Sequence, residues 1–139
     1  MVTMEQYADA VAKLVNVARQ GTGGGLVAAQ VLLSAYNGFD YQLDISSLGN
    51  LDRDNFESAM VIIRGRYETG KEPHTLVANG DRIFGALWNQ WFRLHVKERG
   101  KVDCPRCDGR GRTYANDNDE DGTPCALCEG KGRVCRCRV

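Results

Sequence analysis

Six cysteines are the residues in this sequence best suited to chemistry, and the first hundred residues contain none of them. Four of the six form two Cys-x-x-Cys pairs, Cys104 with Cys107 and Cys125 with Cys128. Two thiolates separated by two residues can bind one metal ion from a tight turn, and two such turns complete a tetrahedral site. Coordination by four thiolates leaves no position for an activated water. The sequence therefore predicts one structural Zn²⁺ rather than a catalytic ion.

Both pairs belong to an internal repeat of the form Cys-x-x-Cys-x-Gly-x-Gly. Its glycines are Gly109, Gly111, Gly130 and Gly132. Because glycine readily adopts positive φ, each turn can direct backbone amides toward the sulfurs. A single Cys-x-x-Cys could be a redox pair, but the doubled motif favours metal binding. That interpretation also fits a reducing compartment, where disulfide frameworks are rare.

Two further cysteines, Cys135 and Cys137, follow the second repeat. They could be free thiols, alternative metal ligands, or a redox pair that closes a strained disulfide. The sequence leaves these three alternatives open.

Basic residues are concentrated around the two pairs: Arg106, Arg110, Arg112, Lys131, Arg133, Arg136 and Arg138. Arg110 and Lys131 lie between the two glycines of each repeat, where side chains should point outward. Such a surface suits contacts with nucleic-acid phosphates. It could equally be a solvated face balanced by the acidic segment 116–122, which we expect to form a flexible hairpin.

Few apolar residues follow residue 100, too few to offset the conformational entropy of about forty ordered residues. A structural metal contributes roughly 10–16 kcal/mol to a small fold. We therefore expect a metal-ordered module at 101–139, joined to a helical domain at 1–100.

Charge and hydropathy exclude several classes of protein. Lysine and arginine together number 18, as do aspartate and glutamate, so the formal net charge is zero. No overall field attracts nucleic acid, although a local basic patch is compatible with these totals. The apolar stretches are too short to span a membrane, and no signal peptide opens the sequence. We expect a cytoplasmic protein without a membrane partner.

Hydrophobic periodicity in the first hundred residues predicts four helices. They are expected over residues 3–21, 26–36, 52–70 and 80–100. Glycines 23–25 are interpreted as a connector, because the strand and Gly-Lys-Ser/Thr of a phosphate-binding loop are missing. Residues 39–50 are a long connection that begins with strand-like alternation. The predicted fold is mainly α, a bundle of about four helices with a C-terminal four-cysteine zinc-knuckle module of short β-hairpins.

Two predicted helices have wide apolar faces. The third carries Phe56, Met60, Ile63 and Tyr67, and the fourth carries an aromatic series that ends with Trp91 and Phe92. Most of these side chains should be core. An exposed Trp91 or Phe92 could instead anchor a protein partner.

No catalytic signature accompanies these features. His74 and His95 have no cysteine or serine partner at a recognisable spacing. We therefore expect binding rather than catalysis and no small-molecule substrate, and the role of each histidine stays open.

The doubled motif, from Cys104 to Gly132, resembles the cysteine-rich zinc domain of DnaJ-type co-chaperones. That family carries four copies of the motif and two zinc ions, so two copies imply one zinc. The His-Pro-Asp signature of a J domain is absent from this sequence.

The overall layout is similar to the antitermination proteins of lambdoid bacteriophages, which are small, mostly helical and equipped with two such knuckles. This resemblance implies ligands at Cys104, Cys107, Cys125 and Cys128, and contact with promoter-proximal DNA and RNA polymerase.

Three functional hypotheses follow. The first is a phage-like regulator that contacts DNA or RNA and the transcription machinery through the basic knuckles. The second is an inhibitor or adaptor that binds a host protein, RNA polymerase or another factor, through the aromatic helix. The third is a thiol-based chaperone or redox protein.

Overall fold

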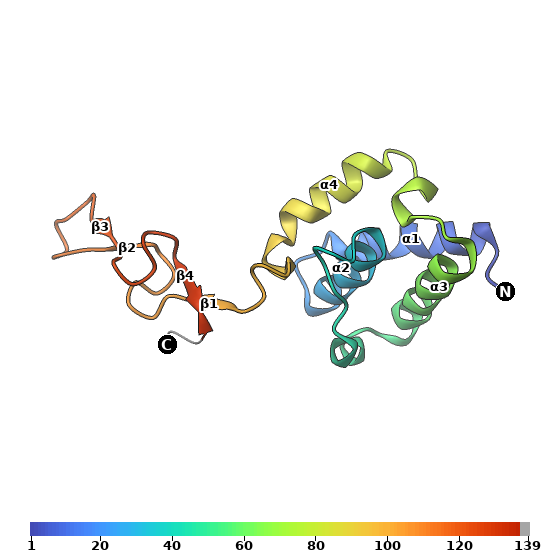
Figure 1. Ribbon diagram of the computed structural model, residues 1–139, viewed down its shortest axis with the longest axis horizontal. Helices are drawn as coiled ribbons and strands as arrows, with labels where there is room; N and C mark the ends of the chain where they lie inside the picture. Colours follow the sequence, from blue (N-terminus) through green and yellow to red (C-terminus); the bar gives the residue numbers. More distant parts are fainter. Residues whose placement is uncertain (137–139) are drawn as a thin grey trace. The chain divides into compact units, whose positions relative to one another are not determined.

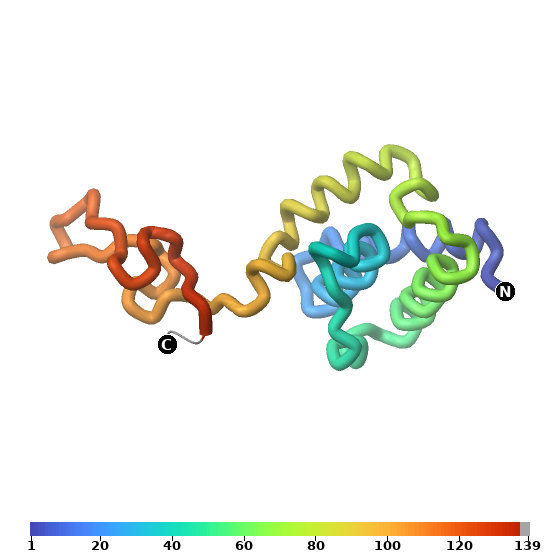
Figure 2. The backbone as a smooth tube through the Cα atoms, in the orientation of Figure 1, coloured from blue at the N-terminus to red at the C-terminus, as the bar shows by residue number. Residues whose placement is uncertain are grey.

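The computed structural model describes residues 1–136, which form a mainly α structure with a small cysteine module, as the sequence predicts (Figure 1). Four α-helices and three short 3₁₀ helices precede two pairs of short strands within this described range. The chain divides into two compact units, Met1–Lys97 and the residues from Glu98 onward. We call them the helical unit and the cysteine module. Figure 2 traces the backbone of each unit in turn.

The first helix, α1, spans Met4–Ala18. It begins with the expected capping box, in which Thr3 and Gln6 exchange side-chain to backbone hydrogen bonds. Its predicted stripe is buried, with Tyr7, Val11, Leu14, Val15 and Ala18 all in the core. Periodicity alone identified this helix and its buried face.

The second helix, α2, spans Gly23–Tyr36 and is buried on most of its faces. The expectation that residues 23–25 are a connector is wrong, because they form the first turn of α2. Thr22 caps this turn by accepting a hydrogen bond from the Gly25 N–H, at 3.0 Å. A Cβ on Gly25 would lie 2.2 Å from the carbonyl oxygen of Gln20. A close backbone approach therefore explains the glycine here.

The segment after α2 is a long connection, as expected, and it contains a 3₁₀ helix, η1 (Ile45–Asn50). Asp44 caps η1 through the backbone N–H of Ser46. The connection packs inward through Tyr41, whose hydroxyl donates to the Trp88 carbonyl at 3.2 Å. Burial raises the pKa of Tyr41 to about 12.

The third helix, α3, spans Arg53–Thr69 and is capped by Asp52, one of the two expected residues. It buries Ala59, Ile62 and Gly65, whereas Ile63 and Tyr67 are 41% and 89% exposed. The expected apolar face is therefore rotated away from the core. Small residues at the buried positions allow α3 to approach α1 closely.

The fourth helix, α4, spans Gly80–Gln90 and follows the 3₁₀ helix η2 (Pro73–Leu76). The chain then forms a third 3₁₀ helix, η3 (Phe92–Leu94), so α4 is shorter than the expected 80–100. Trp91 ends α4 with non-helical dihedral angles. Its indole donates to the Ala18 carbonyl at 2.7 Å, which satisfies a backbone acceptor at the end of α1.

The cysteine module contains two antiparallel pairs of strands. Strand β1 (Lys101–Asp103) pairs with β4 (Arg133–Cys135), and β2 (Arg112–Thr113) pairs with β3 (Thr123–Pro124). No helix among the described residues is long and apolar enough to cross a bilayer.

Candidate metal centre

Four cysteine sulfurs converge in the cysteine module. The Sγ atoms of Cys104, Cys107, Cys125 and Cys128 all lie within 4.8 Å of one another, and all four side chains are buried. The sulfurs of Cys104 and Cys125 are 3.8 Å apart, and those of Cys107 and Cys128 are 3.7 Å apart. These distances are far longer than a disulfide bond of about 2.05 Å. The cluster can hold one metal ion.

Each Cys-x-x-Cys turn directs a backbone amide at its second sulfur. Gly111 N–H donates to the Sγ of Cys107, and Gly132 N–H donates to the Sγ of Cys128, each at 3.2 Å. These bonds confirm the expected role of the glycines, because amide donors stabilise negative charge on a metal-bound thiolate.

The backbone reaches this geometry through residues with positive φ. In the first repeat they are Asp108, Gly109 and Gly111, and in the second they are Glu129, Gly130 and Gly132. The equivalent residues have φ within a few degrees of each other, so the two repeats adopt the same conformation. Asp108 and Glu129 have positive φ although they are not glycines, and the glycine pattern of the repeat does not identify them.

The two turns are also hydrogen-bonded to each other. Cys104 N–H donates to the Gly132 carbonyl at 2.8 Å, and Cys125 N–H donates to the Gly111 carbonyl at 2.9 Å. A Cβ on Gly111 would lie 2.6 Å from a carbonyl oxygen of the opposite turn, and a Cβ on Gly132 would lie at 2.5 Å. Close packing between the repeats therefore excludes side chains at both positions, a constraint that one repeat alone does not reveal.

The site favours the thiolate form of Cys125. Hydrogen bonding from the Cys128 backbone is the largest influence on the Cys125 thiol, and it lowers the pKa to about 7 despite the opposing effect of burial. A thiolate is the form that binds metal. The local structure thus prepares the sulfur for coordination.

Short strands frame the cluster. The β1–β4 pair places Val102 opposite Val134, and Val134 is buried against the cysteines. Arg133 holds the start of the module, donating to the Lys101 carbonyl at 2.8 Å and lying 3.6 Å from a Glu98 carboxylate oxygen. Its guanidinium is therefore engaged in the fold.

The acidic segment between the repeats is a hairpin, as expected, and it has internal order. The Asp119 carboxylate accepts hydrogen bonds from the Ala115 and Gly122 amides, and these bonds lower its pKa. Arg112 donates to the Asp121 carbonyl at 2.6 Å and to the Gly122 carbonyl at 3.0 Å. Arg112, like Arg133, thus bonds to backbone carbonyls of the module.

The remaining basic residues have a different environment. Arg106, Arg110, Lys131 and Arg136 are exposed, and their side chains make no hydrogen bond or ion pair within residues 1–136. Arg106 and Arg110 line a hollow of about 240 Å³ together with Tyr114. Tyr114 is 45% exposed, and no pattern in the sequence singles it out. Arg138 lies outside the described residues.

Cys135 lies apart from the cluster. Cys135 is exposed on β4 and is not one of the four converging residues. It lines a second small hollow with Lys131 and Arg133. Cys137 lies outside the described residues, so its three alternatives stay open.

Neither histidine lies at the metal cluster. His95 is buried in the helical unit, with Nε2 3.2 Å from an Asp40 carboxylate oxygen and Nδ1 accepting the Lys97 N–H. This arrangement fixes the chain after η3 to the connection after α2. His74 lies between Glu72 and Asp81, with nitrogen to oxygen distances of 3.4 and 3.6 Å.

The aromatic pair proposed as an interface is divided by the structure. Trp91 is only 2% exposed, and its indole N–H is bonded to α1, so it is a core residue and not a surface anchor. Phe92 is 46% exposed. Of the two, only Phe92 is accessible to a partner.

Comparison with known proteins identifies the helical unit. Residues 8–92 match a family described as a family of unknown function, DUF7673. The matched residues run from α1 to the start of η3 and stop before the cysteine module. No curated protein and no solved structure matches the chain. Because the family match covers more than half of the sequence, the protein belongs to the family of unknown function DUF7673.

Proposed function

We propose that this protein is a non-enzymatic regulator in which a structural zinc ion orders a basic module that contacts nucleic acid. The single observation that carries the proposal is the set of exposed basic side chains on the paired repeats. Arg106, Arg110 and Lys131 project from a backbone that is held in place by the metal cluster and by bonds between the repeats. A rigid arrangement of cations suits phosphate recognition.

Zinc is the metal that best fits the ligand set. In a tetrahedral site with Zn–S bonds of about 2.3 Å, neighbouring sulfurs are about 3.8 Å apart. Two of the six sulfur–sulfur separations, 3.8 Å and 3.7 Å, match this edge length, and all six are within 4.8 Å. Four soft thiolate ligands also favour zinc over magnesium or calcium. With all four positions filled by sulfur, the ion has a structural role.

Pseudo-symmetry of the repeats supports the choice of contact residues. Arg110 and Lys131 occupy equivalent positions, and their backbone amides donate to the Cys107 and Cys128 carbonyls in the same way. Tyr114 beside Arg106 and Arg110 adds a ring on which an unpaired base can stack. The arrangement favours single-stranded nucleic acid, or a locally opened duplex, within a transcription complex.

Binding of fluorescent oligonucleotides over a salt series tests the proposal with the zinc-loaded, full-length protein. We expect affinity to fall steeply with salt, and the combined Arg110→Glu and Lys131→Glu variant to reduce the salt slope by about two. The matched control, Lys13→Glu with Arg82→Glu, makes the same change of charge on exposed residues of the helical unit. Equal binding by the two double variants would refute the proposal.

A second candidate function is a protein-binding inhibitor or adaptor, which the exposure of Phe92 favours. Capture of host proteins by the zinc-loaded protein, with and without nuclease, separates the two. Recovery of RNA polymerase or another factor that survives nuclease and is lost in Phe92→Ala supports the adaptor. Retention of that factor by Phe92→Ala, with loss in the Arg110 and Lys131 double variant, supports the basic module.

A further inference from the structure

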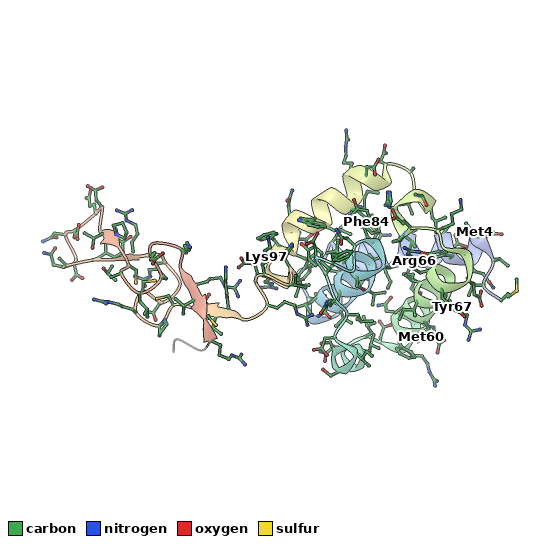
Figure 3. All side chains as sticks on the ribbon, in the orientation of Figure 1. Met4, Met60, Arg66, Tyr67, Phe84 and Lys97 are labelled. Atoms are coloured by element: carbon green, nitrogen blue, oxygen red, sulfur yellow. The ribbon has the colours of Figure 1, made fainter. Side chains whose placement is uncertain are left out.

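An apolar row on α3 faces away from the core of the helical unit. We define the α3 row as Phe56, Met60, Ile63 and Tyr67. Phe56 packs partly against the core, whereas Ile63 and Tyr67 are exposed. Figure 3 labels Met60 and Tyr67 on this helix. Their spacing of four, three and four residues is that of one helix packing lengthwise against another.

A shallow hollow of about 560 Å³ lies along the row, lined by Met60, Ile63 and Tyr67 with Arg64 and Glu68. A Tyr67 ring that is 89% exposed beside such a hollow leaves a large apolar area in water. Contiguous apolar surface with a charged border is typical of an interaction site.

The charges that border the row identify the occupant. Four charged residues follow one another along this side of α3 with alternating sign: Arg53, Glu57, Arg64 and Glu68. The first three are exposed, whereas the Glu68 side chain is 20% exposed. Their spacing is symmetric about the midpoint of the helix, but their signs are opposite at equivalent distances from it. A second α3 running antiparallel therefore places Glu57 opposite Arg64, and Arg53 opposite Glu68. In a parallel pair related by a two-fold axis, the charged sides of the two copies lie on opposite sides of the seam and do not meet.

The apolar row lies close to the same register. With Glu57 beside Arg64 of a second copy, Met60 is offset from Ile63, and Phe56 from Tyr67, by two residues, or about 3 Å along the helix axis, which long side chains can span. A two-fold interface must be self-complementary in both shape and charge. We propose that α3 binds α3 of a second copy of this chain, antiparallel and around a two-fold axis.

Within one copy, Arg64 and Glu68 already make contacts, but the contact of Arg64 is a weak surface ion pair. Arg64 lies 3.8 Å from Glu68, and its side chain is 66% exposed. Glu68 also accepts a hydrogen bond from the Val2 amide at 2.7 Å. Arg64 can therefore turn toward Glu57 of the second copy without leaving a buried charge unpaired. This inference concerns the helical unit and is independent of the proposed nucleic-acid function.

Sedimentation of the zinc-loaded, full-length protein over roughly 1–100 μM tests for a dimer, since a small helix pair is expected to associate in this range. Tyr67→Asp should weaken dimerisation at least tenfold while preserving helicity, because the side chain is exposed in the single copy. The control is Phe39→Asp, which changes a side chain that is 93% exposed elsewhere in the helical unit. A wild-type protein that stays monomeric throughout overturns the proposal.

Charge reversal tests the antiparallel register itself. Glu57→Arg and Arg64→Glu should each weaken self-association about tenfold or more, because each variant creates two repulsive contacts per dimer. Mixing these two variants should restore a dimer, since every contact between the unlike copies is then attractive. The combined Glu57→Arg and Arg64→Glu variant should also dimerise, although it loses the Arg64 to Glu68 pairing within one helix. Absence of pairing in the mixture would rule out this register.

Discussion

The helical unit and the cysteine module are each stabilised internally, but by different interactions. The helical unit contains nineteen buried hydrophobic residues in one core. In the described part of the module, the corresponding cluster consists of four cysteines and Val134. Burying one valine stabilises a fold by about 1.5–3 kcal/mol, whereas ordering each residue costs about 1–2 kcal/mol. We therefore expect the module to depend on a bound metal ion, and the helical unit to be stable without one.

Removing one metal ligand should have the largest effect. Cys104→Ser should forfeit most of a metal contribution of roughly 10–16 kcal/mol, so the module should lose its zinc and become protease-sensitive. The helical unit should unfold as before. Both tryptophans, Trp88 and Trp91, lie in that unit, so tryptophan fluorescence follows its unfolding alone.

Cys135→Ser is the matched control, because Cys135 is not among the converging sulfurs. It should keep a full equivalent of zinc. Normal zinc content and protease resistance in Cys104→Ser would contradict the four-cysteine assignment. Loss of zinc in Cys135→Ser would instead favour its role as an alternative ligand.

The reciprocal substitution removes a core side chain of the helical unit. Phe84 is fully buried, so Phe84→Ala should lower the free energy of unfolding of the helical unit by about 3–5 kcal/mol. Denaturant unfolding followed by tryptophan fluorescence measures this loss. The module should retain its zinc, as measured by release to a colorimetric chelator. Zinc loss in parallel with helical unfolding would show that the two units are not independent in stability.

The same contrast explains what could be predicted from the sequence. The four converging cysteines lie within two short segments, and their spacing alone predicts a four-cysteine metal site. The caps at Thr3 and Asp52 are equally local signals. Such features depend on residues close in sequence, so no knowledge of the fold was needed to find them.

Features that depend on tertiary packing were harder to predict from the sequence. The inner face of α3 is set by Ala59 and Gly65, whose small size permits close approach of another helix but contributes little to a hydrophobic pattern. Periodicity favoured Ile63 and Tyr67 instead. The end of α4 depends on Trp91 bonding to Ala18, and these residues are far apart in sequence.

The basic surface shows the same limit. Arg112 and Arg133 are chemically identical to Arg106 and Arg110 in the sequence, yet their guanidinium groups hold backbone carbonyls of the module. Only the hairpin and the β1–β4 pairing bring those carbonyls within reach. Side-chain type therefore identified a basic cluster, and the fold decided which members bond to the backbone and which do not.

The smallest effect we predict tests how closely the two repeats depend on each other. Gly132→Ala introduces a Cβ at a φ of 80° and 2.5 Å from a carbonyl oxygen of the first repeat. Backbone strain of this kind costs about 1–3 kcal/mol, so zinc affinity should fall by roughly ten- to a hundredfold. Competition with a chelator of known affinity measures the change.

Gly111→Ala is the symmetric variant, with a φ of 80° and a Cβ 2.6 Å from a carbonyl of the second repeat. Because the two turns exchange equivalent hydrogen bonds, the two substitutions should weaken zinc binding to a similar extent. Gly100→Ala is the control, since a Cβ there meets open space. If Gly111→Ala and Gly132→Ala differ greatly, one repeat binds the metal without support from the other. If they agree, the metal and the contacts between the repeats form one cooperative unit, which the helical core neither supplies nor replaces.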